Sequence, residues 1–169
     1  MYGKLRGKKA LITGASKGIG RAIAEELSFY GVKVALLARS KDKLDDVVDG
    51  IARSGNKALA LKSDLRDENS ILSAIVKYKE QFGSLDFLIN NAGVYLLTPV
   101  DSATENDWDK QIDTTLKAPF FCSQAICVSV TSPAPPSRIA RIVGASNPDD
   151  VNSNPSPTTG EGVTPSPRL

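Results

Sequence analysis

A glycine-rich segment at residues 13–20 has the residue types and spacing that bind a phosphate group. Its glycines follow the pattern Gly-x-x-x-Gly-x-Gly, a relative of the dinucleotide fingerprint Gly-x-Gly-x-x-Gly. Glycines let the backbone approach a pyrophosphate, and a helix that follows offers free N–H groups and the positive end of its dipole. We therefore predict a nucleotide site here. Its predicted binding residues are Gly14, Ser16, Lys17, Gly18, Ile19 and Gly20.

Two cations indicate which nucleotide this site takes. A site selective for NAD places a carboxylate about 20 residues further on, at the end of the second strand, to bind the ribose 2′-hydroxyl. Here that place holds Arg39, and no carboxylate comes before Asp42. Arg39 and Lys17 could instead neutralise a 2′-phosphate, a group that guanidinium suits. We predict NADP(H) rather than NAD as the cofactor; the alternative is that both cations are solvated surface residues.

The elements that must position this site alternate along the chain. Short apolar runs at 10–12, 32–38, 58–61 and 87–89 predict strands. Amphipathic stretches predict four helices. Two lie at 18–30 and 41–53, and a third runs from the N-cap Asp67 to about 82. The fourth, at 105–129, follows the N-cap Thr104 and should bend near Pro119. In the first helix Ile19, Ile23 and Leu27 share one face. This order predicts an α/β fold, a doubly wound, Rossmann-type parallel sheet.

Composition excludes several classes of protein. The 169 residues are 41% apolar and 24% charged with a net charge of +2, so we predict a soluble globular protein with no nucleic-acid footprint. No apolar run reaches about 18 residues, which excludes a membrane-spanning helix. The N-terminus lacks the pattern of a signal peptide, so we expect a cytoplasmic protein. Histidine is absent and we predict no metal site. Cys122 and Cys127 should lie on different faces of a helix, and we expect both to be buried thiols in a reducing compartment.

The last third of the chain differs from the rest. Eight of the ten prolines lie from Pro133 onward, and no aromatic residue follows Phe121. We predict a nucleotide-binding domain at 1–130, a candidate fifth strand (138–143) and loop within 131–146, and a disordered Pro/Ser/Thr-rich tail at 147–169. The sheet is expected to be incomplete on its C-terminal side. A frame change, an alternative exon or a truncated gene model would explain the abrupt change in composition.

Four motifs in order resemble the short-chain dehydrogenase/reductase family over roughly residues 5–130. They are the glycine motif, Asp64 after the third strand, Asn90-Asn91-Ala92-Gly93 after the fourth, and Trp108-Asp109 through Leu116-Lys117-Ala118-Pro119-Phe120. The resemblance implies that Asp64 and Leu65 hold the adenine of the cofactor. It also implies that Asn90 stabilises the sheet, and that the segment from Asn90 to Gly93 lines the cofactor's ribose, with Asn91, Ala92 and Gly93 as predicted binding residues.

The resemblance also implies a set of catalytic residues that this sequence does not match. The family uses an asparagine, a serine and a tyrosine with a lysine four residues later for general acid catalysis and oxyanion stabilisation. Thr115 stands at the asparagine position, and Ser146 is a weak substitute for the serine. No tyrosine follows Tyr95 and no lysine follows Lys117. Tyr78 and Tyr95 are poor replacements, because one should pack inside and the other has no lysine partner.

Two functions follow from this combination. By resemblance the chain is an NADP(H)-dependent oxidoreductase, a carbonyl reductase or alcohol dehydrogenase acting on a small carbonyl or alcohol, whose catalytic Tyr and Lys are absent from these residues. The alternative is a non-catalytic NADP(H)-binding or interaction module, or a non-functional gene fragment. We expect no membrane or nucleic-acid partner. A homo-oligomer of the family type is also not expected, because its C-terminal interface would be missing.

Overall fold

Within the part of the chain that the structure describes, four parallel strands form one sheet. The computed structural model describes residues 4–129, so the candidate strand at 138–143, Ser146 and the tail at 147–169 lie outside the described residues. The strands are β1 (Lys9–Thr13), β2 (Lys33–Ala38), β3 (Ala58–Lys62) and β4 (Phe87–Ile89). They lie in the order β3-β2-β1-β4. This order equals the first four positions of a doubly wound sheet, 3-2-1-4, which confirms the predicted fold class.

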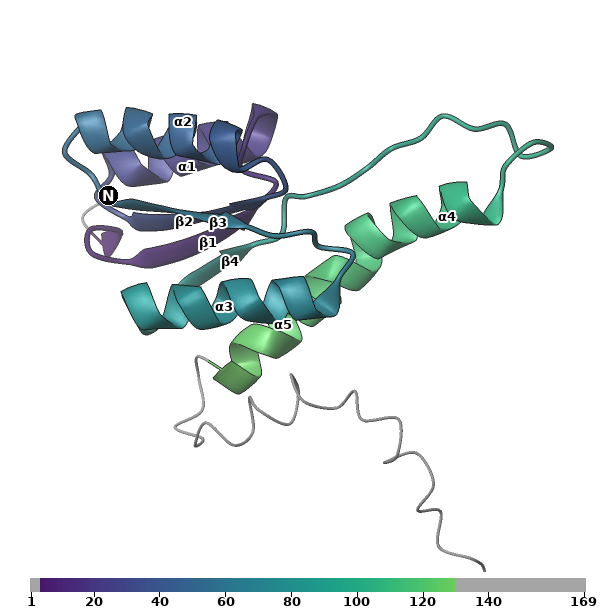
Figure 1. Cartoon of the computed structure of the whole chain (residues 1–169). Helices are drawn as coiled ribbons and strands as arrows, with labels where there is room; N and C mark the ends of the chain where they lie inside the picture. Colours follow the sequence, from purple (N-terminus) through teal and green to yellow (C-terminus); the bar gives the residue numbers. More distant parts are fainter. Residues whose placement is uncertain (1–3, 130–169) are drawn as a thin grey trace, which may run out of the picture.

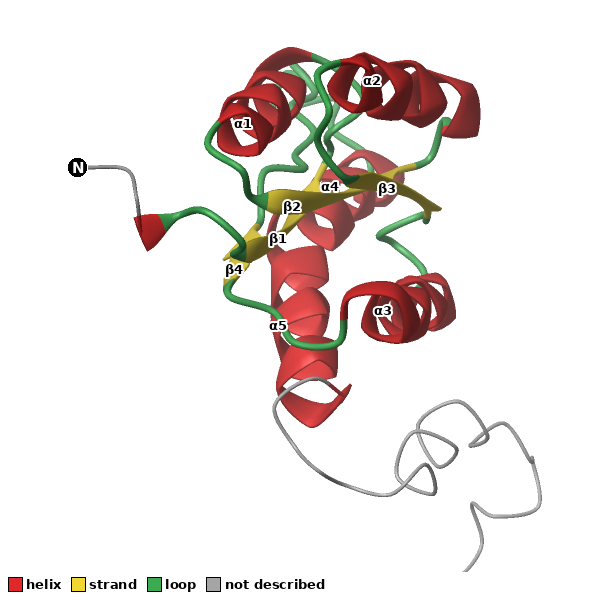
Figure 2. Ribbon diagram, turned by 90° about the vertical axis from the view of Figure 1, so that its left-hand side faces the viewer, coloured by secondary structure: helices red, strands yellow, loops and turns green. Residues whose placement is uncertain are grey.

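Helices cover both faces of this sheet. They are α1 (Gly18–Phe29), α2 (Lys41–Arg53), α3 (Glu68–Phe82), α4 (Glu105–Ile112), a π-helical turn η2 (Asp113–Lys117) and α5 (Ala118–Ser129). Figure 2 shows α1 and α2 on one face and α3 and α5 on the other. Strand side chains alternate between the two layers: Ile12 and Leu36 pack under α1 and α2, while Leu11 and Leu37 pack against α3 and α5.

The buried face of α1 differs from the apolar face that its sequence indicates. Gly20, Ala24 and Ser28 are its buried residues, whereas Ile19 is 75% exposed. Ile23 and Leu27 lie only at the margin of the core. Small residues allow this helix to approach the sheet closely, so the large apolar residues lie on its flank.

The last helical stretch is interrupted just before Pro119. Thr104 caps α4 as predicted, in a capping box with Asp107. The π-helical turn η2 separates α4 from α5, and the Ala118 N–H donates a hydrogen bond to the carbonyl of Asp113. Proline has no N–H to donate and its ring crowds the preceding turn, so the hydrogen-bond pattern changes where the sequence predicts a bend. Segment 90–104 and α4 extend away from the sheet (Figure 1).

Several smaller expectations can be compared with this arrangement. Cys122 is buried and Cys127 exposed, which fits the prediction that they lie on different faces of a helix. The expectation that both thiols are buried is wrong for Cys127, because a residue five positions further on points away from the core that Cys122 faces. Burial raises the pKa of the Cys122 thiol to about 11. Within residues 4–129, no helix is long and apolar enough to cross a membrane, and no group of side chains has the composition of a metal site.

Candidate functional site

The glycine loop after β1 is tied to the chain that follows β4. The backbone N–H groups of Asn91 and Ala92 each donate to Thr13 Oγ1 at 3.0 Å, and Asn91 Nδ2 donates to the Thr13 carbonyl at 2.9 Å. The family resemblance assigns the role of stabilising the sheet to Asn90. In this structure Asn91 makes these bonds and Asn90 is exposed, so the assignment is wrong by one residue.

Two glycines of the motif meet different physical requirements. Gly18 adopts φ +58°, a conformation that favours glycine, and a Cβ there would have no heavy atom within 4 Å. Its backbone therefore faces open space that a ligand can occupy. A Cβ on Gly20 would lie 2.4 Å from Asn91 Nδ2 and 2.6 Å from the Gly14 carbonyl oxygen. Gly20 thus permits close packing beneath the loop rather than contact with a ligand.

The helices that begin at this loop and after β2 have uncapped N-termini. Neither Lys17 before α1 nor Ser40 before α2 makes a side-chain capping bond, and α1 has no acidic residue in its first turn. By contrast, Asp67 accepts hydrogen bonds at the start of α3, and Thr104 caps α4. The free N–H groups of α1 therefore remain available to an anion at the glycine loop.

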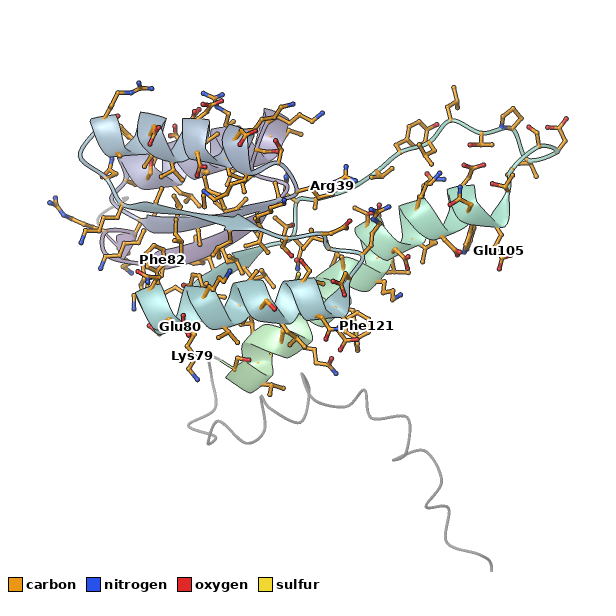
Figure 3. All side chains as sticks on the ribbon, viewed as in Figure 1. Arg39, Lys79, Glu80, Phe82, Glu105 and Phe121 are labelled. Carbon is orange, nitrogen blue, oxygen red and sulfur yellow. The ribbon has the colours of Figure 1, made fainter. Side chains whose placement is uncertain are left out.

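A cavity of about 560 Å³ lies over the carboxyl ends of the strands. All predicted cofactor-binding residues line it except Gly20, which lies behind the loop. Figure 3 shows Arg39 at the end of the sheet where this cavity opens. Seven lining residues were not predicted: Ala38, Ser40, Lys43, Ser63, Arg66, Val94 and Thr114. Ser40 and Lys43 lie near the predicted Arg39, and Arg66 near Asp64, so proximity along the sequence was the available signal.

The charge of this cavity is predominantly positive. Lys17, Arg39, Lys43 and Arg66 line it together with one carboxylate, Asp64. Arg66 forms an ion pair with Asp64, and its hydrogen bond is the main cause that lowers the pKa of that carboxyl. Among residues 4–129, the other three cations have no ion-pair partner. Three uncompensated positive charges at one cavity favour a phosphorylated ligand.

The candidate catalytic residues either form hydrogen bonds with the backbone or lie outside the cavity lining. The Thr115 hydroxyl accepts from Val94 N at 3.3 Å and donates to the Val94 carbonyl at 3.4 Å, so it holds the backbone of segment 90–104. Tyr78 is fully buried and donates to the Ser84 carbonyl at 3.0 Å; burial raises the pKa of its hydroxyl. Tyr95 is 81% exposed and does not line the cavity.

Sequence comparison relates the chain to a family of oxidoreductases. Residues 8–143 match the sequence profile described as short chain dehydrogenase. Gluconate 5-dehydrogenase of Gluconobacter oxydans (strain 621H) is 36% identical over 122 residues, which span 72% of this chain and 48% of that protein. The 3-oxoacyl-[acyl-carrier-protein] reductase FabG of Staphylococcus aureus (strain Mu50) is 42% identical over 118 residues, covering 69% and 48%. The chain thus spans about half the length of these curated relatives.

Solved structures share both the fold and the sequence pattern. A short-chain dehydrogenase from Burkholderia cenocepacia J2315 in complex with NADP superposes with a TM-score of 0.71 at 36% identity, covering 75% of this chain and 52% of that one. A metagenomic short-chain oxidoreductase in complex with NADP has a TM-score of 0.70 at 35% identity, covering 73% and 57%. Both similarities extend over most of this chain and about half of the compared structure.

Proposed function

Because the chain belongs to the short-chain dehydrogenase family, we propose that it binds NADP(H) in the cavity over the carboxyl ends of its strands. The observation that carries the proposal is the clustering of Lys17, Arg39 and Lys43, without ion-pair partners among the described residues, around a glycine loop and an uncapped helix. A dinucleotide with an extra phosphate complements this arrangement in charge and in hydrogen bonding. NADP in the two solved structures described above supports the same cofactor.

The order of strands suggests how the cofactor would lie. The pyrophosphate would lie over Gly18 at the N-terminus of α1, and the 2′-phosphate beside Arg39 and Lys17. Adenine would extend beyond β2 toward Asp64 and Leu65 at the end of β3, while Asn91, Ala92 and Gly93 would border the other half. When bound, the nicotinamide would supply or accept a hydride. The residues of this chain would bind and orient the cofactor through charge and backbone N–H groups.

Cofactor titration tests this proposal. The full chain should bind NADPH at least about 10-fold more tightly than NADH, because a 2′-phosphate gains charge-assisted hydrogen bonds that a hydroxyl lacks. Isothermal titration calorimetry with both cofactors measures the two dissociation constants. The preference should shrink as salt rises, since exposed charges are screened. Failure to bind either cofactor would contradict the proposal, and equal affinities would contradict the role of the cations.

The whole protein's activity is proposed to be hydride transfer between NADP(H) and a small carbonyl or alcohol. One observation favours a second function, a non-catalytic NADP(H)-binding module: within the 169 residues no tyrosine follows Tyr95 and no lysine follows Lys117. In addition, the Thr115 hydroxyl forms hydrogen bonds with the backbone N–H and carbonyl of Val94. These residues therefore supply a cofactor site without the general acid that the family uses.

A hydride-transfer assay separates these two functions. We expect these 169 residues to oxidise NADPH at least about 100-fold more slowly than a full-length family member with the same carbonyl panel, because general acid catalysis is worth about 10²–10⁴-fold. The loss of NADPH absorbance at saturating cofactor provides the rate. A comparable rate would contradict the non-catalytic assignment and require an acid other than the family's tyrosine. A chain that binds no cofactor and shows no activity would match a non-functional fragment.

A further inference from the structure

Arg66 donates three hydrogen bonds to the carboxylate of Asp64. Its backbone N–H and its Nε each donate to Asp64 Oδ1 at 3.1 Å, and Nη2 donates to Oδ2 at 2.6 Å. A guanidinium that meets both oxygens in this way fixes the orientation of the carboxylate as well as its charge. The two residues lie on the short turn between β3 and the start of α3, and both line the cavity.

The position of this pair in the fold identifies the part of a dinucleotide that it would meet. Along the sheet, β1 carries the glycine loop, β2 leads to Arg39, and β3 leads to Asp64. If the pyrophosphate lies over α1 and the 2′-phosphate beside Arg39, the base lies at the end of β3. Arg39 is also close enough to Asp64 to help lower the pKa of its carboxyl.

The hydrogen bonds from Arg66 leave a specific acceptor free. Each carboxylate oxygen accepts about two hydrogen bonds, and Oδ1 already accepts two from Arg66. Oδ2 accepts one from Arg66, so a second acceptor site remains on that oxygen. In residues 4–129 no other hydrogen-bond donor is assigned to Oδ2. A ligand at the base end of the cavity therefore meets a deprotonated, oriented oxygen that can accept and cannot donate.

The family resemblance already implies that Asp64 holds the adenine; it assigns no role to Arg66. We propose that Arg66 is the positioning residue of this contact, and that it sets the base specificity by holding Asp64 so that Oδ2 accepts a hydrogen bond from the exocyclic amino group of adenine. This inference rests on the proposed binding of NADP(H). A base with an oxo group in place of the amino group presents an acceptor to another acceptor, so neither group is satisfied. The cavity thus selects a 6-amino purine over a 6-oxo purine, and Arg66 contributes by orienting its neighbour.

The test compares NADPH with its analogue in which hypoxanthine replaces adenine. The full chain should bind NADPH about 10- to 100-fold more tightly than the analogue, the effect of one hydrogen bond to a charged group. Asp64→Asn should bring this ratio near one, since an amide can donate to the oxo group. Arg66→Ala should reduce the ratio to about one third or less of the wild-type value. Arg66→Lys should also reduce this ratio, because lysine carries the charge but lacks the planar guanidinium that bonds both carboxylate oxygens.

Arg21→Ala is the matched control. Arg21 also forms an ion pair on an exposed surface, with Glu25 at 2.8 Å, and it does not line the cavity. This variant should keep the wild-type ratio, and circular dichroism should show that all variants are folded. An Arg66→Ala variant that weakens both cofactors equally would overturn the inference, because Arg66 would then act only as a general cation. Failure of the wild-type chain to bind NADPH would contradict the proposed function itself.

Discussion

Arg39→Asp is expected to reverse the cofactor preference of this protein. The affinity for NADPH should fall by about 100-fold or more, because the substitution removes charge-assisted hydrogen bonds to the 2′-phosphate and places a like charge beside it. The affinity for NADH should be unchanged or higher, since a carboxylate at the end of β2 accepts hydrogen bonds from the ribose hydroxyls. Calorimetric titration of wild type and variant with both cofactors measures all four dissociation constants.

A second charge reversal isolates the local effect of Arg39. Arg53 lies exposed at the end of α2 and does not line the cavity. Arg53→Asp changes the net charge by the same amount, yet it should alter NADPH affinity by no more than about 2-fold, because exposed distant charges are screened. Equal losses of NADPH affinity in both variants would mean that overall charge, rather than contact with a 2′-phosphate, determines binding.

Gly20→Ala is expected to disrupt both the fold and the site. The new methyl group would lie 2.4 Å from Asn91 Nδ2 and 2.6 Å from the Gly14 carbonyl oxygen. The Gly14 carbonyl belongs to the backbone, so it cannot move away by rotating a side chain. Overpacking of this kind costs about 1–3 kcal/mol of stability. The shift should also separate Asn91 from the Thr13 carbonyl and displace the glycine loop. Urea unfolding and NADPH titration should therefore both register a loss.

Gly50→Ala provides the matched comparison. Gly50 lies within α2, and a Cβ there would meet only Arg53 Nη2, at an ordinary 3.9 Å. Replacing a helical glycine with alanine should raise stability by about 0.5–1 kcal/mol and leave NADPH affinity unchanged. A Gly20→Ala variant as stable as wild type would contradict the close packing of the glycine loop on α1. A destabilised variant with normal cofactor affinity would separate that packing from binding.

Features of this protein that depend on local patterns could be predicted from its sequence. Short, continuously apolar runs such as residues 34–38 indicated strands buried on both faces, and the spacing of Gly14, Gly18 and Gly20 indicated a phosphate loop. The caps at Asp67 and Thr104 were predictable for the same reason, because a cap acts within one turn of its own helix.

Which residues meet across the sheet depends on how the separate elements pack together. The order β3-β2-β1-β4 brings Lys43 and Arg66 together at the cavity of the glycine loop. Each lies near a predicted site residue in the sequence, but that proximity alone does not establish that their side chains share the cavity. Asn91 rather than Asn90 binds Thr13, because the irregular chain after β4 has no period that fixes which side chain turns inward. The hydroxyl of Thr115 bonds Val94, 21 residues away along the chain. Such contacts depend on how separate elements pack, and packing involves residues distant in sequence.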